Sequence, residues 1–106
     1  MEAAARGARS AGGITIGILP SSNPRTANSY IDFPIATGLG EARNFIIINT
    51  SDALVAVDGK YGTLTEIAAA LGLGKIVAGI STWDIPGVHP FETAQEAMDY
   101  IYSVLR

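Results

Sequence analysis

The sequence alternates short apolar segments with segments of helix-forming residues. The predicted strands are residues 14–19, 30–36, 53–57 and 76–80, and the predicted helices are residues 2–11, 41–50, 63–73 and 92–105. The strand segments are almost wholly apolar, which is typical of a mostly parallel sheet with helices on both faces. The sequence therefore predicts one three-layer α/β/α domain over residues 1–106.

Two of these assignments require a choice. The run I-I-I within 41–50 is typical of a strand, but Ala42, Phe45, Ile46 and Asn49 recur at helical spacing, so we predict a helix. Pro34 lacks a backbone N–H, and it places the strand 30–36 at a sheet edge or interrupts it.

Composition narrows the function classes. The chain has 48% apolar and 16% charged residues, a net charge of −3, and scattered basic residues, which argues against a nucleic-acid partner. It has no cysteine and no apolar run near membrane length, and the stretch M-E-A-A-A-R-G-A-R is not typical of a secretory signal. We expect a soluble cytoplasmic protein with no membrane partner, no metal site and no resident cofactor.

The segment 57–66, V-D-G-K-Y-G-T-L-T-E, joins a predicted strand to a predicted helix. Its two glycines permit close approach of a ligand to the backbone, and a helix N-terminus attracts anions. We therefore predict an anion site formed by Gly59, Lys60, Tyr61, Gly62 and Thr63. The alternative is an ordinary strand-to-helix turn in which Thr63 is the N-cap.

Two charged residues are candidates to face such a ligand. Glu66 lies one turn into the helix and points back towards the loop, where it meets a ligand or forms a capping box with Thr63. Arg43 follows the glycine-rich stretch T-G-L-G, which contains Gly38 and Gly40 as further ligand contacts. Arg43 is either a solvated surface residue or a clamp for phosphate or carboxylate.

Three stretches, G-G-I-T-I-G-I-L-P, T-G-L-G-E-A-R-N and D-A-L-V-A-V-D-G-K-Y-G-T-L-T-E-I-A-A-A-L, resemble the Rossmann-like Lonely Guy/molybdenum-cofactor-carrier superfamily. Its members often carry the label "possible lysine decarboxylase". The resemblance covers nearly the whole chain and is greatest for the carrier-like branch. It implies a Rossmann-like fold and a homo-oligomer, a dimer or tetramer.

In Lonely Guy enzymes a P-G-G-x-G-T-x-x-E motif and an upstream arginine serve phosphoribohydrolase chemistry on nucleoside 5′-monophosphates. The resemblance places the motif's glutamate at Glu66 and the arginine at Arg43, as candidate catalytic residues. Two positions depart from the motif, since Asp58 replaces the proline and Lys60 the second glycine. The resemblance also implies a further strand and glycine-rich loop before Met1, so we expect the chain to be truncated relative to the family.

Three functions are compatible with these residues. The first is a binding or carrier protein for a small phosphorylated, nucleotide-like ligand such as the molybdenum cofactor. The alternatives are a nucleoside-monophosphate phosphoribohydrolase and a truncated domain that acts as a partner subunit without its own ligand. Lysine decarboxylation is not expected, because Lys60 and Lys75 are the only lysines and Lys75 is predicted to cap the helix 63–73. We interpret Trp83 as a packing residue, with stacking on a base as the alternative, and His89 as a surface loop residue.

Overall fold

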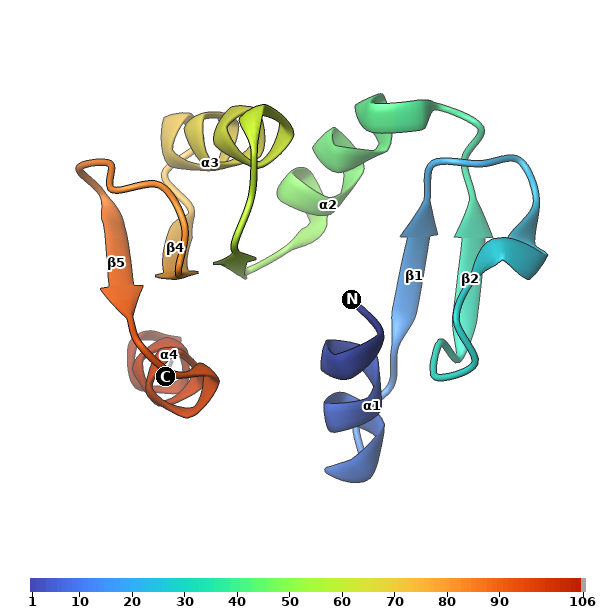
Figure 1. The fold of residues 1–106 in the computed structure, drawn as a ribbon, viewed down its shortest axis with the longest axis horizontal. Helices are drawn as coiled ribbons and strands as arrows, with labels where there is room; N and C mark the ends of the chain where they lie inside the picture. The colour runs from blue at the N-terminus through green and yellow to red at the C-terminus, as the bar shows by residue number, and fades with distance from the viewer. Residues whose placement is uncertain (106) are drawn as a thin grey trace. The chain divides into compact units, whose positions relative to one another are not determined.

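The computed structural model describes residues 1–105, and the chain divides into two compact units, Met1–Ile46 and Ile47–Arg106. Unit 1 contains α1 (Glu2–Ser10), β1 (Ile16–Leu19), η1 (Pro24–Thr26), β2 (Phe33–Ala36) and η2 (Gly40–Arg43), and α2 (Asn44–Thr50) crosses the boundary. Unit 2 contains β3 (Ala53–Val57), α3 (Tyr61–Gly72), β4 (Ile76–Ile80), β5 (Val88–Phe91) and α4 (Ala94–Val104) (Figure 1). The fold is mixed α/β with parallel sheets, as predicted.

Unit 2 is a three-layer sandwich. Its sheet has the strand order β3-β4-β5, and both pairs are parallel. One face packs on a cluster of Ile48, Ile67, Ala70 and Val77, which brings α2 and α3 onto the sheet. The other face packs on α4 through a second cluster of Ala78, Ala97 and Ile101. Because side chains alternate across a strand, Val77 and Ala78 serve opposite faces, which explains why β4 is apolar at every position.

Unit 1 contains a separate two-stranded parallel sheet, in which Ile16 pairs with Phe33 and Ile18 with Ile35. These four side chains share one face because paired residues and residues two apart point the same way. Ile16, Phe33 and Ile35 are 59%, 59% and 48% exposed. This apolar face is thus uncovered within the part of the chain that the structure describes, and self-association stays a prediction.

The structure corrects several predicted boundaries. The strands 14–19 and 30–36 are shorter, at Ile16–Leu19 and Phe33–Ala36, and Pro34 lies in a strand paired on one side, as expected for an edge. The predicted helix 41–50 is confirmed as helical, although it begins with the 3₁₀ turn η2. The strand β5 was not predicted; its sequence V-H-P-F offers only four residues, one of them proline, and it lies at the sheet edge.

Lys75 makes hydrogen bonds at the C-terminal ends of two helices, α3 and α2. Gly74, with φ of +73°, donates its N–H to Leu71 O, and Lys75 donates its N–H to Ala70 O, which is the Schellman arrangement. The Lys75 ammonium instead donates to Ser51 O at 2.6 Å, beyond the C-terminus of α2. The predicted cap at α3 therefore comes from the backbone of Lys75, while its side chain stabilises the end of α2.

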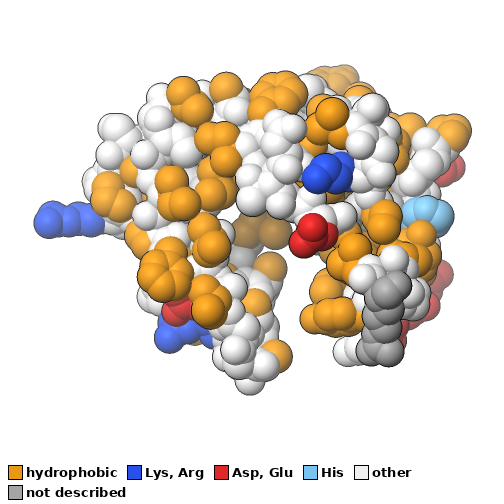
Figure 2. All heavy atoms as spheres, turned by 180° about the vertical axis from the view of Figure 1, so that it is seen from behind, with side chains coloured by type: hydrophobic (Ala, Val, Ile, Leu, Met, Phe, Trp, Pro, Cys, Tyr) orange, Lys and Arg blue, Asp and Glu red, His pale blue; other side chains and the backbone are white. Residues whose placement is uncertain are grey.

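The surface is rich in apolar side chains. Figure 2 shows one face, on which hydrophobic side chains occupy much of the area and Lys, Arg, Asp and Glu are few. Within residues 1–105 no helix combines the length and the hydropathy that crossing a bilayer requires.

Candidate functional site

In unit 2 the neighbouring strands β3 and β4 end at the same edge of the sheet. Val57 and Ile80 form their last registered pair, and Asp58 donates its backbone N–H to Ile80 O at 3.0 Å. Asp58 and Ser81, the residues that follow, have φ of +52° and +51°. This left-handed conformation is uncommon outside glycine, and such residues concentrate at functional sites. The carboxyl edge of this sheet therefore carries both of the non-glycine residues with positive φ among those that the structure describes.

The loop after β3 is folded tightly around Gly59. Its φ is +123°, and a Cβ added there would lie 2.3 Å from Thr63 Cβ and 2.4 Å from Thr63 Oγ1. Only glycine allows both that backbone angle and the close approach of Thr63. Gly59 and Thr63 are thus in close contact, with the threonine side chain lying against the loop.

The structure places the start of α3 two residues earlier than predicted. The helix begins at Tyr61 after the N-cap Lys60, whose side chain makes no capping hydrogen bond. Thr63 therefore lies inside the first turn, and its predicted roles as N-cap and as capping-box partner of Glu66 are wrong. The first N–H of α3 to reach a carbonyl four residues back belongs to Leu64, which donates to Lys60 O at 3.1 Å. The first-turn amides of residues 61–63 precede that bond, so they have no intrahelical acceptor.

Glu66 lies one turn further along α3 and is half-buried. Residues three apart on a helix are neighbours on its surface, which places Glu66 beside Thr63. The next residue, Ile67, is 2% exposed and packs into the core. Glu66 is therefore at the edge of the core-facing side of α3, next to Thr63, which contacts the loop after β3.

Trp83 fastens the loop after β4 to the loop after β3. Its indole Nε1 donates to Lys60 O at 3.0 Å, and its ring stacks on Tyr61 with centroids 6.0 Å apart and planes inclined at 29°. Trp83 also packs against the core cluster that contains Ile48 and Val77, so the predicted packing role is correct. Tyr61 is 79% exposed and forms the outer side of this aromatic pair.

The remaining predicted residues lie in unit 1. Gly38 and Gly40 have φ of +65° and +58°, and their N–H groups donate to Ser21 O and Pro20 O, both at 3.0 Å. Their amides are therefore occupied in joining the loops after β1 and β2.

Arg43 is half-buried, which rules out the solvated surface residue considered from the sequence. Its Nη1 donates to Ile18 O at 2.5 Å, near the carboxyl end of β1. Its Nε is buried and has no hydrogen-bond partner among residues 1–105. A guanidinium held this way presents only part of its donor set to a ligand.

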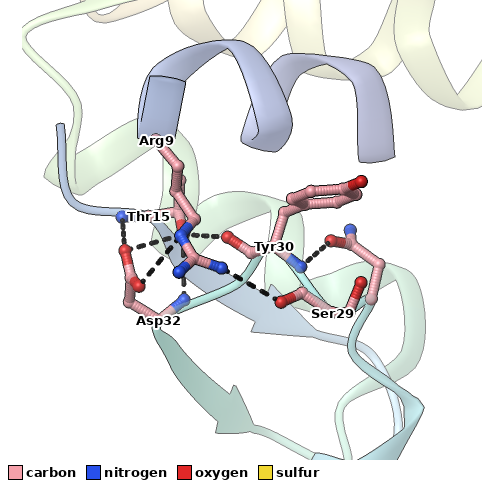
Figure 3. A network of polar contacts seen from close by, with 6 residues as sticks. Arg9, Thr15, Ser29, Tyr30 and Asp32 are labelled. Carbon is pink, nitrogen blue, oxygen red and sulfur yellow. Dashed lines mark hydrogen bonds and ion pairs between the residues drawn. The ribbon is translucent and has the colours of Figure 1, made fainter. Parts of the chain in front are cut away.

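A polar network in unit 1 was not anticipated from the sequence (Figure 3). Asp32 Oδ2 accepts hydrogen bonds from the N–H of Thr15 at 2.8 Å and from its hydroxyl at 3.1 Å, and Asp32 pairs with Arg9 at 3.5 Å. The Thr15 backbone donor is the main cause that lowers the pKa of Asp32; burial acts in the opposite direction, and the Thr15 hydroxyl and Arg9 lower it further. The network joins α1 to the β1–β2 sheet and has a structural role. Among the described residues, no three His, Asp or Glu side chains are grouped as metal ligands.

The chain matches the SLOG cluster4 family over residues 1–104. It belongs to that family. An uncharacterized protein of Archaeoglobus fulgidus is 48% identical over 104 residues, covering 97% of this chain and 68% of the relative.

Two solved structures of named proteins have the same fold. The molybdenum cofactor binding protein of Rippkaea orientalis matches with a TM-score of 0.87 and 34% identity, over 97% of this chain and 69% of its own. The Moco carrier protein of Chlamydomonas reinhardtii matches with a TM-score of 0.83 and 37% identity, over 99% and 70%. These similarities to molybdenum cofactor binding and carrier proteins support a ligand-carrier role in general.

Proposed function

We propose that this chain is a binding or carrier protein for a small phosphorylated, nucleotide-like ligand, whose anionic group sits at the start of α3. The observation that carries the proposal is the exposed first turn of that helix. Its amides at residues 61–63 lack intrahelical acceptors, and residues 58–62 are exposed. Amides of this kind, together with the helix dipole, form an anion site.

The charges around this turn are compatible with one anion. Lys60 is the N-cap residue and is exposed, so its ammonium can reach a phosphate at the helix start. Asp58, whose backbone is left-handed, carries a negative charge in the same exposed loop, directly before Gly59. In this proposal the Lys60 charge offsets that of Asp58, and the ammonium adds to the amides of the first turn in holding the anion.

The molybdenum cofactor is our specific candidate for the cargo. The names of the similar structures support this choice: they are a molybdenum cofactor binding protein from Rippkaea orientalis and a Moco carrier protein from Chlamydomonas reinhardtii. The cofactor combines a phosphate with a pterin ring system, so it belongs to the class of phosphorylated, nucleotide-like ligand proposed for this site.

Calorimetric titration with ribose 5-phosphate tests the anion site directly. We expect saturable binding that weakens as salt is added, because an exposed charge pair is screened. Lys60→Gln should weaken it about 1.4-fold to fivefold, the worth of one exposed charge contact. The matched control Arg6→Gln removes the same charge from an exposed residue of α1 and should leave the affinity unchanged. Equal losses in both variants, or no binding by the wild-type chain, would contradict the proposal.

Incubation with AMP separates a carrier from an enzyme. A carrier binds AMP and releases it intact, so chromatography should detect no free adenine. Adenine release that Glu66→Gln abolishes would instead identify a phosphoribohydrolase and overturn the carrier assignment.

A further inference from the structure

A cavity of about 310 Å³ opens beside the carboxyl end of β4, wholly within unit 2. It is lined by Gly79, Ser81, Thr82, Trp83, Asp84, Val88 and Pro90. Its volume lies at the lower end of the range for small-molecule sites, and a cavity at the carboxyl ends of parallel strands is in the usual place for one. It is large enough for a ring system but small for a whole nucleotide.

The backbone around the cavity is shaped by one glycine and one strained residue. A Cβ on Gly79 would lie 2.6 Å from Thr82 Cγ2 and 2.9 Å from Val88 Cγ1, so only glycine lets the loop after β4 lie this close to the strand. Ser81 begins that loop with φ of +51°. Gly79 and Ser81 therefore fix the course of the backbone around the cavity.

The wall formed by Trp83 connects this cavity to the proposed anion site. The indole is held by its hydrogen bond to Lys60 O and by Tyr61, and it lines the cavity as well. An aromatic ring fixed on two sides offers a stacking surface without the entropy cost of ordering it. The N-cap of α3 and the cavity are thus separated by a single side chain.

The polar groups of the cavity indicate what kind of ring it accepts. Asp84 is exposed and lines the cavity with a carboxylate, which accepts hydrogen bonds and cannot donate them when ionised. Thr82 Oγ1 is buried without a partner among the described residues, a condition that is rare in folded proteins. A carboxylate suits a ring edge with two adjacent N–H donors, which guanine and pterins present and adenine does not.

We propose that this cavity holds a guanine-like or pterin ring of the same ligand whose phosphate binds at the start of α3, with Trp83 as the stacking surface and Asp84 as the acceptor. This inference rests on the proposed function and extends it from a phosphate site to a ring-specific site. It assigns a binding role to two residues that follow β4, namely Trp83 and Asp84.

Trp83 is the only tryptophan in the chain, so its fluorescence reports on the cavity without a label. Saturation with GMP should change the emission far more than saturation with ribose 5-phosphate, which has no ring to stack on the indole. Trp83→Leu should weaken GMP about tenfold or more, the usual cost of losing one base–aromatic stack, and should weaken ribose 5-phosphate far less, through the lost indole bond to Lys60 O alone. Trp83→Phe should retain most of the affinity. Tyr102→Leu, which removes an exposed aromatic from α4, is the control and should change neither ligand.

The choice of ring is tested with IMP, which lacks the exocyclic amino group of GMP. The wild-type chain should prefer GMP to IMP, and Asp84→Asn should reduce that preference. Unchanged emission at saturating GMP, or equal weakening of GMP and ribose 5-phosphate by Trp83→Leu, would overturn the ring site. If Trp83→Leu does not fold, the wild-type emission and the Asp84→Asn comparison decide. Ribose 5-phosphate binding without any gain from the ring refutes this inference alone, whereas no binding of ribose 5-phosphate refutes the proposed function as well.

Discussion

The substitution Gly59→Ala tests whether the loop after β3 is as tightly folded as the structure indicates. Gly59 combines a φ of +123° with a Thr63 side chain that would lie 2.3 Å from an added Cβ. Holding a non-glycine residue at such a backbone angle costs about 1–3 kcal/mol. Overpacking against a side chain that is itself fixed in a helix adds about 1–3 kcal/mol. We therefore expect the free energy of unfolding to fall by about 2–6 kcal/mol.

Urea unfolding followed by the emission of Trp83 measures this loss within unit 2. The matched control is Gly74→Ala, because Gly74 also has a positive φ, +73°, but has no atom within 4 Å of an added Cβ. It should cost about 1–2 kcal/mol, from the backbone angle alone. In the Gly59→Ala background, Thr63→Gly should recover the packing part and show a coupling of about 1–3 kcal/mol. Equal costs for the two alanine variants would refute the close contact between Gly59 and Thr63.

Two further predictions concern polar contacts outside the site. Asp32 has a lowered pKa in the folded chain. Its contribution to the free energy of unfolding is therefore present above the ordinary carboxyl pKa of about 4 and is lost as the pH falls through the folded value. Asp32→Asn should remove this acid-dependent loss in urea unfolding followed by circular dichroism, whereas an unchanged pH profile would show that the hydrogen bonds from Thr15 contribute nothing. Lys75→Met removes the 2.6 Å hydrogen bond to Ser51 O and should cost about 1–2 kcal/mol in the same assay. The control Lys60→Met, at an exposed position, should cost less than about 0.5 kcal/mol. If it costs as much as Lys75→Met, the Lys75 side chain does not stabilise the C-terminus of α2 as assigned.

The ends of four strands were predictable from the sequence, and the reason is physical. Each is followed by proline, glycine or polar residues, which end an apolar run abruptly, and the structure ends the strands at Leu19, Ala36, Val57 and Ile80 as expected. The helical character of 41–50 was also predictable, because side-chain periodicity outweighed the β propensity of its isoleucines. These features are local, so a single sequence contains them.

What the sequence could not predict depends on contacts between segments. Thr63 fits an N-cap by its position after Gly62, but the first turn of α3 forms at Tyr61, so the local pattern misplaced the cap by three residues. The cavity after β4 depends on the closeness of Gly79 to Val88, and no spacing in the sequence reports that distance. The lowered pKa of Asp32 likewise arises from Thr15, seventeen positions away.

The bond from the Trp83 indole ends on the carbonyl of residue 60, not on its side chain. Any amino acid at that position offers the same carbonyl, so a mutation there can alter the charge beside the helix start without releasing the two loops from each other. Relatives that differ at residue 60 can therefore have diverged in the anion they prefer while retaining one common loop architecture.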